Sequence, residues 1–164
     1  FCIAWPCSGS QVLQSAVTPD GTLRVEVADY ATLTKFELWS TPTAGGMRKK
    51  IGGPVAADYD VSEFVLSADG SRVAYRQGRT ATGEWALYSG LTSGPGAVII
   101  SQPMAPGGAV MPGLKLLSGD RVRYQADAES DEQYLYWVTS VTGGRILREI
   151  YSDGFNDGTT GGWR

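Results

Sequence analysis

The sequence predicts an all-β fold made of three tandem repeats, each with four short antiparallel strands. Three observations favour it: sequence markers that recur at nearly constant spacing, strand-length apolar runs bounded by turn residues, and a β-prone composition. The 164 residues include 22 Gly and 8 Pro. The many Val, Thr, Tyr and Trp residues suit pleated strands joined by tight turns. No window has a sustained 3.6-residue apolar period, so essentially no helix is expected.

Three markers occur in the same order in each repeat. A turn marker is followed by a Leu-aromatic pair and then by a Gly-rich turn. The markers are Asp20-Gly21, Asp69-Gly70 and Gly119-Asp120; Leu38-Trp39, Leu87-Tyr88 and Leu135-Tyr136; and Gly45-Gly46, Gly94-Pro95-Gly96 and Gly143-Gly144. The aspartates of the first marker are 49 and 51 residues apart, and the leucines are 49 and 48 apart. We expect Asp20 and Asp69 to bond the backbone of their own turns, and the three aromatic residues to pack between neighbouring repeats.

Each repeat divides into four predicted strands, the first two of which are joined by a tight hairpin whose Gly supplies the positive φ. In chain order the predicted strands are Leu13–Val17, Thr22–Ala28, Lys35–Thr41, Met47–Ile51, Val61–Leu66, Arg72–Gln77, Glu84–Ser89, Ala97–Ile100, Leu114–Leu117, Arg121–Gln125, Gln133–Val138 and Arg145–Ile150. Four strands in a unit of ~40–50 residues are typical of a β-propeller blade. The predicted blades cover about residues 11–57, 58–108 and 109–150.

The turns resemble one family of propellers in particular. The segments Thr18-Pro19-Asp20-Gly21-Thr22 and Ser67-Ala68-Asp69-Gly70-Ser71-Arg72 are similar to the Ser-Pro-Asp-Gly turn and basic residue of the TolB-type repeat. The resemblance covers about residues 11–150 and is weaker in the third unit, where Ser118-Gly119-Asp120 has lost a turn residue. It implies a periplasmic or secreted protein that binds other proteins or precedes a peptidase domain.

Three blades are too few for a ring, because closed propellers normally have ~4–8. An open stack is expected to leave apolar blade faces in water, which favours association. Two chains could form a six-bladed ring, the chain could be the C-terminal part of a larger propeller, or copies could add head to tail into a filament. A homo-oligomer or polymer is therefore the expected partner state.

The segments outside the blades are residues 1–10 and 151–164. Cys2 and Cys7 could close a short disulfide loop or remain two thiols, and the disulfide indicates an oxidising compartment. The tail from Asp153 to Trp163 resembles the Asp-Gly-Phe-Glu-Ser-Gly…Trp segment of secreted bacterial proteins, with Asn156 in place of Glu. It is either a Gly-rich end anchored by Phe155 and Trp163, or a segment that uses these two residues to dock on a neighbouring subunit.

Composition argues against several function classes. The net charge of −3 gives no basic surface for nucleic acid, and no apolar stretch approaches the ~18 residues of a membrane span. With no His and two Cys, a Ser-His-Asp triad and the usual zinc ligand sets are missing. No catalytic residue, cofactor or metal site is predicted. The acidic residues Asp127, Glu129, Asp131 and Glu132 favour a solvated loop, with Ca²⁺ binding as the alternative.

These observations favour an extracellular or periplasmic, non-enzymatic structural or interaction module that self-assembles through its blade faces. The alternative is a carbohydrate- or peptide-binding propeller, which would use aromatic residues on loops and rims such as Trp5, Tyr30 or Trp85.

Overall fold

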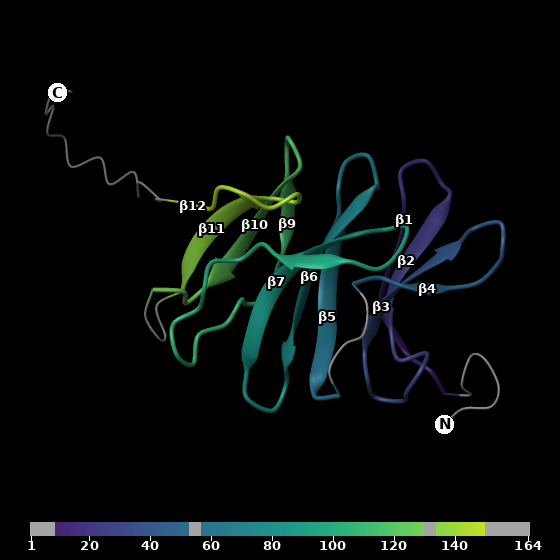
Figure 1. Cartoon of the computed structure of the whole chain (residues 1–164), viewed down its shortest axis with the longest axis horizontal. Coiled ribbons are helices and arrows are strands. Elements are labelled where there is room, and N and C mark those ends of the chain that lie inside the picture. The colour runs from purple at the N-terminus through teal and green to yellow at the C-terminus, as the bar shows by residue number, and fades with distance from the viewer. Residues whose placement is uncertain (1–8, 53–56, 130–133, 150–164) are drawn as a thin grey trace, which may run out of the picture.

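The computed structural model describes residues 9–52, 57–129 and 134–149. Over these residues the fold is all-β, with no helix and three four-stranded antiparallel sheets. The sheets stand side by side in chain order and do not close into a ring (Figure 1). The predicted fold class is therefore confirmed. No helix among the described residues is long and apolar enough to cross a membrane.

Each sheet is a simple meander, with strands paired in sequence order. Blade 1 contains β1 (Val12–Val17), β2 (Leu23–Ala28), β3 (Glu37–Pro42) and β4 (Lys49–Lys50). Blade 2 contains β5 (Tyr59–Leu66), β6 (Arg72–Arg79), β7 (Glu84–Leu91) and β8 (Ala97–Ile99). Blade 3 contains β9 (Lys115–Leu117), β10 (Arg121–Ala126), β11 (Leu135–Ser140) and β12 (Leu147–Arg148).

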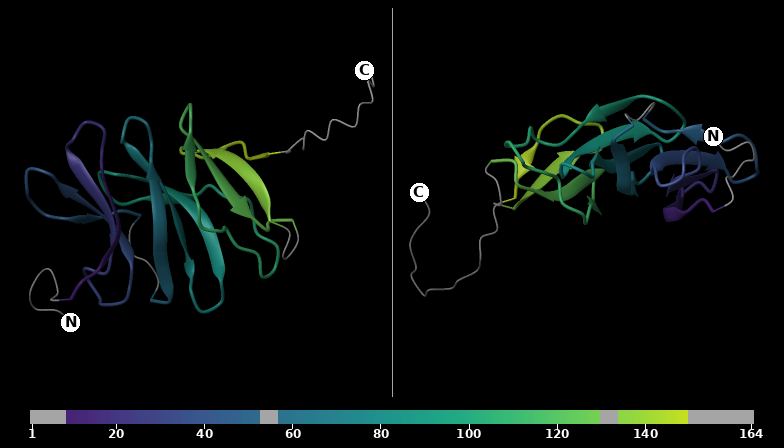
Figure 2. Two further views of the ribbon diagram at one scale, coloured as in Figure 1. Left: turned by 180° about the vertical axis from the view of Figure 1, so that it is seen from behind. Right: turned by 90° about the horizontal axis from the view of Figure 1, so that it is seen from below.

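The core consists of two apolar layers, one on each side of blade 2, and the three sheets are arranged as an arc (Figure 2). The layer between blades 1 and 2 is formed by Val25, Val27, Leu38, Ile51, Val61, Phe64, Val73 and Tyr75. The layer between blades 2 and 3 is formed by Ala74, Leu87, Ile100, Val110, Val122, Tyr124, Ala126, Trp137 and Val141. Blade 2 is thus covered on both faces, whereas blades 1 and 3 are each covered by a neighbouring blade on one face.

The strand register corrects the Leu-aromatic marker. The pairs Leu23↔Pro42, Arg72↔Leu91 and Arg121↔Ser140 open the central hairpins at a constant spacing of 49 residues. In this register the third aromatic residue is Trp137, 49 residues after Tyr88, and not Tyr136. Trp137 is buried between blades 2 and 3, and Tyr88 packs against the layer between blades 1 and 2. The expectation that Trp39 and Tyr136 lie between blades is wrong: both lie on the outward faces of blades 1 and 3.

The first two hairpin turns have the expected aspartate caps. The Asp20 carboxylate accepts hydrogen bonds from the Thr18 hydroxyl (2.5 Å) and the Thr22 backbone N–H (3.0 Å). Asp69 does the same with Ser67 and Ser71, at 2.7 and 2.9 Å.

The third turn is one residue shorter, and its aspartate has a different partner. Asp120 has a φ of 51°. Its Oδ1 accepts a hydrogen bond from the backbone N–H of Ala68, 2.6 Å away in the turn of blade 2. The shortened turn therefore binds the neighbouring blade.

One side chain on the first strand of blades 1 and 2 bonds the next blade. The Gln14 amide donates to the carbonyl of Phe64 (2.8 Å) and accepts from its N–H (2.9 Å). The equivalent residue in blade 2, 49 positions later, is Glu63, whose carboxylate accepts the N–H of Gly113 at 2.8 and 3.1 Å. We call these two residues the inter-blade staples. Counting back from the pairs Leu66↔Val73 and Val122↔Leu116, the same position in blade 3 is Gly113.

Candidate functional site

A cavity of about 400 Å³ lies at one corner of blade 2. Strand β8 ends at Ile99, and the chain that follows passes the neighbouring part of β7 on its way to blade 3. The cavity is enclosed by parts of β5, β6 and β7 together with this passing loop. Its lining consists of Tyr59, Gln77, Glu84, Trp85, Ala86, Tyr88 and residues Met104 to Gly108.

Trp85 is held in place by a buried arginine. The Arg76 guanidinium carbon lies 3.9 Å from the centre of the indole ring, within the range of a cation–π contact. Arg76 also donates from Nε to the carbonyl of Val110 (2.6 Å) and from a terminal nitrogen to the Ser62 hydroxyl (2.9 Å). Burial lowers the pKa of Arg76 to about 10, with Glu63 opposing the shift. The guanidinium therefore stays charged at neutral pH and fixes the aromatic ring.

Tyrosine side chains extend from the core into the cavity. The rings of Tyr75 and Tyr88 are stacked with centroids 5.8 Å apart, and Tyr88 lines the cavity beside Tyr59. Burial, and then the neighbouring Tyr59, raise the pKa of Tyr88. The pKa of Tyr75 is also raised, by burial first and then by Tyr88. Both phenols are therefore neutral at physiological pH and can donate or accept hydrogen bonds.

The charged groups at the cavity rim are paired with each other. Arg79 forms ion pairs with Asp58 (2.8 Å) and Glu84 (3.4 Å), and its guanidinium carbon lies 5.1 Å from the Tyr59 ring centre. Glu84 also accepts a hydrogen bond from the Thr82 hydroxyl at 3.0 Å. The rim thus contains no strong excess of one charge.

The loop over the cavity is fixed to blade 3. Its backbone N–H at Ala109 donates to the carboxylate of Asp127, a side chain only 3% exposed. A Cβ at Gly108 would lie 2.7 Å from the Asp127 carbonyl oxygen, so only glycine allows this close approach. Asp127 therefore has a structural role, and Glu129 pairs separately with Arg148 at 3.1 Å. Asp131 and Glu132 lie outside the described residues, so the Ca²⁺ alternative stays a prediction.

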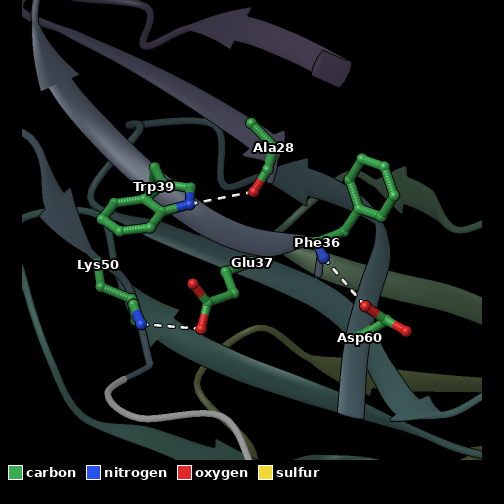
Figure 3. A network of polar contacts seen from close by, with 6 residues as sticks. All are labelled: Ala28, Phe36, Glu37, Trp39, Lys50 and Asp60. Carbon is green, nitrogen blue, oxygen red and sulfur yellow. Dashed lines mark hydrogen bonds and ion pairs between the residues drawn. The ribbon is translucent and has the colours of Figure 1, made fainter. Parts of the chain in front are cut away.

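The outward face of blade 1 is the second feature of interest, and we call it the first end face. It carries Glu26, Glu37, Trp39 and Lys50 together with Arg24, Tyr30 and Arg48. Lys50 pairs with Glu37 at 2.8 Å, and the Trp39 indole donates to the Ala28 carbonyl at 3.2 Å (Figure 3). Arg48 lies 3.7 Å from the centre of the Tyr30 ring. Charges and aromatic rings therefore cover this face together.

The outward face of blade 3, the second end face, has the same character. It carries Arg123, Gln125, Tyr136, Val138, Leu147 and Glu149. Arg123 lies 4.4 Å from the Tyr136 ring centre and 3.7 Å from Glu149. Leu147 is 41% exposed. The expectation of apolar end faces is therefore wrong, because both are covered by arginine or lysine side chains over aromatic rings.

Several residues predicted from the sequence lie outside the described residues. These are Cys2, Trp5, Cys7, Phe155 and Trp163. Within the described part of the chain, no group of three His, Cys, Asp or Glu residues is arranged to hold a metal ion.

Of the aromatic residues proposed for ligand binding, Trp85 lines the cavity and Tyr30 lies on the first end face. Sequence reasoning missed Tyr59, Gln77 and the loop from Met104 to Gly108. The available signal was the Met104-Ala105-Pro106-Gly107-Gly108 run, which lengthens the connection between the second and third repeats.

Comparisons with known proteins give one distant structural neighbour. No protein-family model and no curated protein match the chain. The chain is similar to a solved structure described as putative TolB from Agrobacterium tumefaciens, with a TM-score of 0.41 and 13% sequence identity. The alignment covers 82% of this chain and 63% of that one, so the chain spans less than two thirds of its length. No residue role is transferred from this neighbour.

Proposed function

We propose that the chain is an extracellular or periplasmic, non-enzymatic interaction module that assembles with further copies of itself through its two end faces. The observation that carries this proposal is the open arc. Blade 2 is covered on both sides by apolar layers, whereas each outer blade presents one face on which aromatic and charged side chains are combined.

The composition of the end faces suits protein association. Aromatic residues and arginine are enriched in protein interfaces. An interface built on Arg48, Lys50 and Arg123 would be polar and wet, and its strength would fall as salt screens the charges. Contact between unlike end faces gives a ring if two chains close and a filament if they do not.

The first test is the mass of the native particle by light scattering, at low and high ionic strength. We expect dimers or longer polymers whose mass decreases with added salt. Lys50→Gln removes a charge from the first end face and should reduce the mass. Lys49→Gln is the matched control, because this neighbouring side chain lies on the opposite face of β4. A monomer at every concentration and salt level would contradict the proposal and make the end-face networks solubilising caps.

The proposed location rests on the pair Cys2 and Cys7, which suits an oxidising compartment. The check is the mass of protein purified under non-reducing conditions and treated with a thiol-alkylating reagent. A disulfide leaves the mass unchanged until a reductant is added. Two adducts without reduction would remove this support.

Ligand binding is the second candidate function. It is favoured by the cavity in blade 2, whose volume lies within the ~300–1,000 Å³ of small-molecule sites and whose lining combines aromatic rings with a few polar groups.

A further inference from the structure

We propose that the cavity in blade 2 binds a neutral saccharide, with Trp85 as the surface on which a sugar ring stacks. The proposal develops the ligand-binding function above and does not depend on self-assembly, because the cavity residues are separate from both end faces.

The first argument is the rigid aromatic surface. A pyranose ring has a face of C–H groups that packs against an aromatic ring. Aromatic side chains provide a large contact area at low entropic cost when they are already ordered. Trp85 is ordered by Arg76, which is only 7% exposed and bonded to Val110 and Ser62. The loop opposite is ordered by the buried carboxylate of Asp127. The cavity is therefore preformed.

The second argument is the kind of polar group available to a ligand. The lining offers the Gln77 amide and the hydroxyl groups of Tyr59 and Tyr88, which both donate and accept hydrogen bonds. Such groups match sugar hydroxyls, which also do both. The charges at the rim are already paired, since Arg79 contacts Asp58 and Glu84. An ionic ligand would have to replace these partners, whereas a neutral ligand would not.

The third argument distinguishes a saccharide from an extended peptide. Peptides that bind a sheet usually pair with the main chain of an open edge. Beside the cavity that edge of β7 is occupied by the passing chain. The carbonyls of Trp85 and Leu87 each accept an N–H at 2.8 Å, from Val110 and Ile100, and the Leu87 N–H donates to the Ser101 hydroxyl at 3.2 Å. Side chains are thus the main binding groups that remain.

The test is an array of neutral and acidic oligosaccharides probed with the labelled full chain, followed by calorimetric titration of the strongest binder. We expect a neutral oligosaccharide to bind, and Trp85→Ala and Gln77→Ala each to weaken binding by on the order of tenfold or more. Tyr134→Ala is the matched control, because Tyr134 occupies the position of Trp85 in blade 3. It is 45% exposed and does not line the cavity. Melting temperatures of all variants confirm that they fold.

Three outcomes would overturn the proposal: no saccharide binds, only acidic saccharides bind, or binding survives in both folded cavity variants. A peptide selected from a library, whose binding is lost in Trp85→Ala, would overturn the saccharide but keep the cavity as a binding site. If neither class binds, the ligand-binding function itself fails, while the light-scattering result on self-assembly is unaffected.

Discussion

At the scale of single residues, the cap aspartates illustrate how a short motif determines a local structure. Hydrogen bonds from the Ser67 hydroxyl, and then from the Ser71 backbone and hydroxyl, lower the pKa of Asp69 from its usual 3.8 to about 2. The equivalent bonds in blade 1, from Thr18 first and then Thr22, lower the pKa of Asp20. Each carboxylate is more stable in the folded protein than in the unfolded chain.

This shift predicts a dependence on pH. Because the pKa of Asp69 is lower in the folded state, its contribution to stability is fully present above pH 3.8 and is lost as the pH falls through about 2. Asp69→Asn keeps a turn-forming side chain and removes the charge. We expect the variant to be less stable than the parent at neutral pH, with a difference that shrinks as the pH approaches 2. Urea unfolding at several pH values measures it, and a difference independent of pH would contradict the assignment.

Residue-level patterns also mark where sequence reasoning succeeded. The Asp-Gly turns predicted both carboxylate caps in the regular repeats, because the motif and its bonds are contained within about five residues. The cavity was not predicted, except for Trp85, because its lining comes from three strands and a loop whose proximity depends on the stacking of sheets. Buried Arg76 gives no local signal, since its partners Ser62 and Val110 are far along the chain.

At the scale of elements, the exact repeat lies in the central hairpins. All twelve strands were predicted from runs of apolar residues and turns. The register of the third unit was not, because two candidate aromatic residues, Tyr136 and Trp137, are adjacent in the sequence. A shift of one residue moves a side chain to the opposite face of a sheet. The shortened third turn then offset the sequence markers on its two sides.

The inter-blade staples predict a specific loss of stability. Gln14→Ala removes two hydrogen bonds and leaves the Phe64 N–H and carbonyl without these partners, which costs ~1–3 kcal/mol. Gln14→Glu keeps an acceptor for the N–H but places a carboxylate oxygen near the carbonyl, so it should recover little of this loss. Gln11→Ala is the control, because Gln11 is an exposed residue just before β1. Chemical unfolding measures the effect, and equal stability of Gln14→Ala and Gln11→Ala would show that the staple contributes nothing.

At the scale of the whole molecule, the two apolar layers make blade 2 the centre of stability. In stacked repeats each unit is stabilised mainly by its neighbours. Blade 2 has a described neighbour on each side, and its residues Val73, Ala74 and Leu87 are fully buried.

Hydrogen exchange should therefore be slowest in β6 and β7 and faster in the outer blades, since local opening is easiest where fewest contacts must be broken. Exchange measured by NMR or mass spectrometry tests this for the separate chain. Association through the end faces should slow exchange in β3 and β11 and leave β6 and β7 nearly unchanged. Uniform protection of all three blades in a monomer would contradict this view of the fold.

The glycine at the third staple position gives the arc a direction. The earlier blade at each joint supplies a side chain that binds the next, but blade 3 has Gly113 at this position, with a φ of 109° that favours glycine. If two copies meet with blade 3 against blade 1, their seam has no such link. Under mechanical load an assembly should then part at the seams while the joints inside each chain still hold. Single-molecule pulling would reveal this as release of intact chains before unfolding, and the reverse order would refute it.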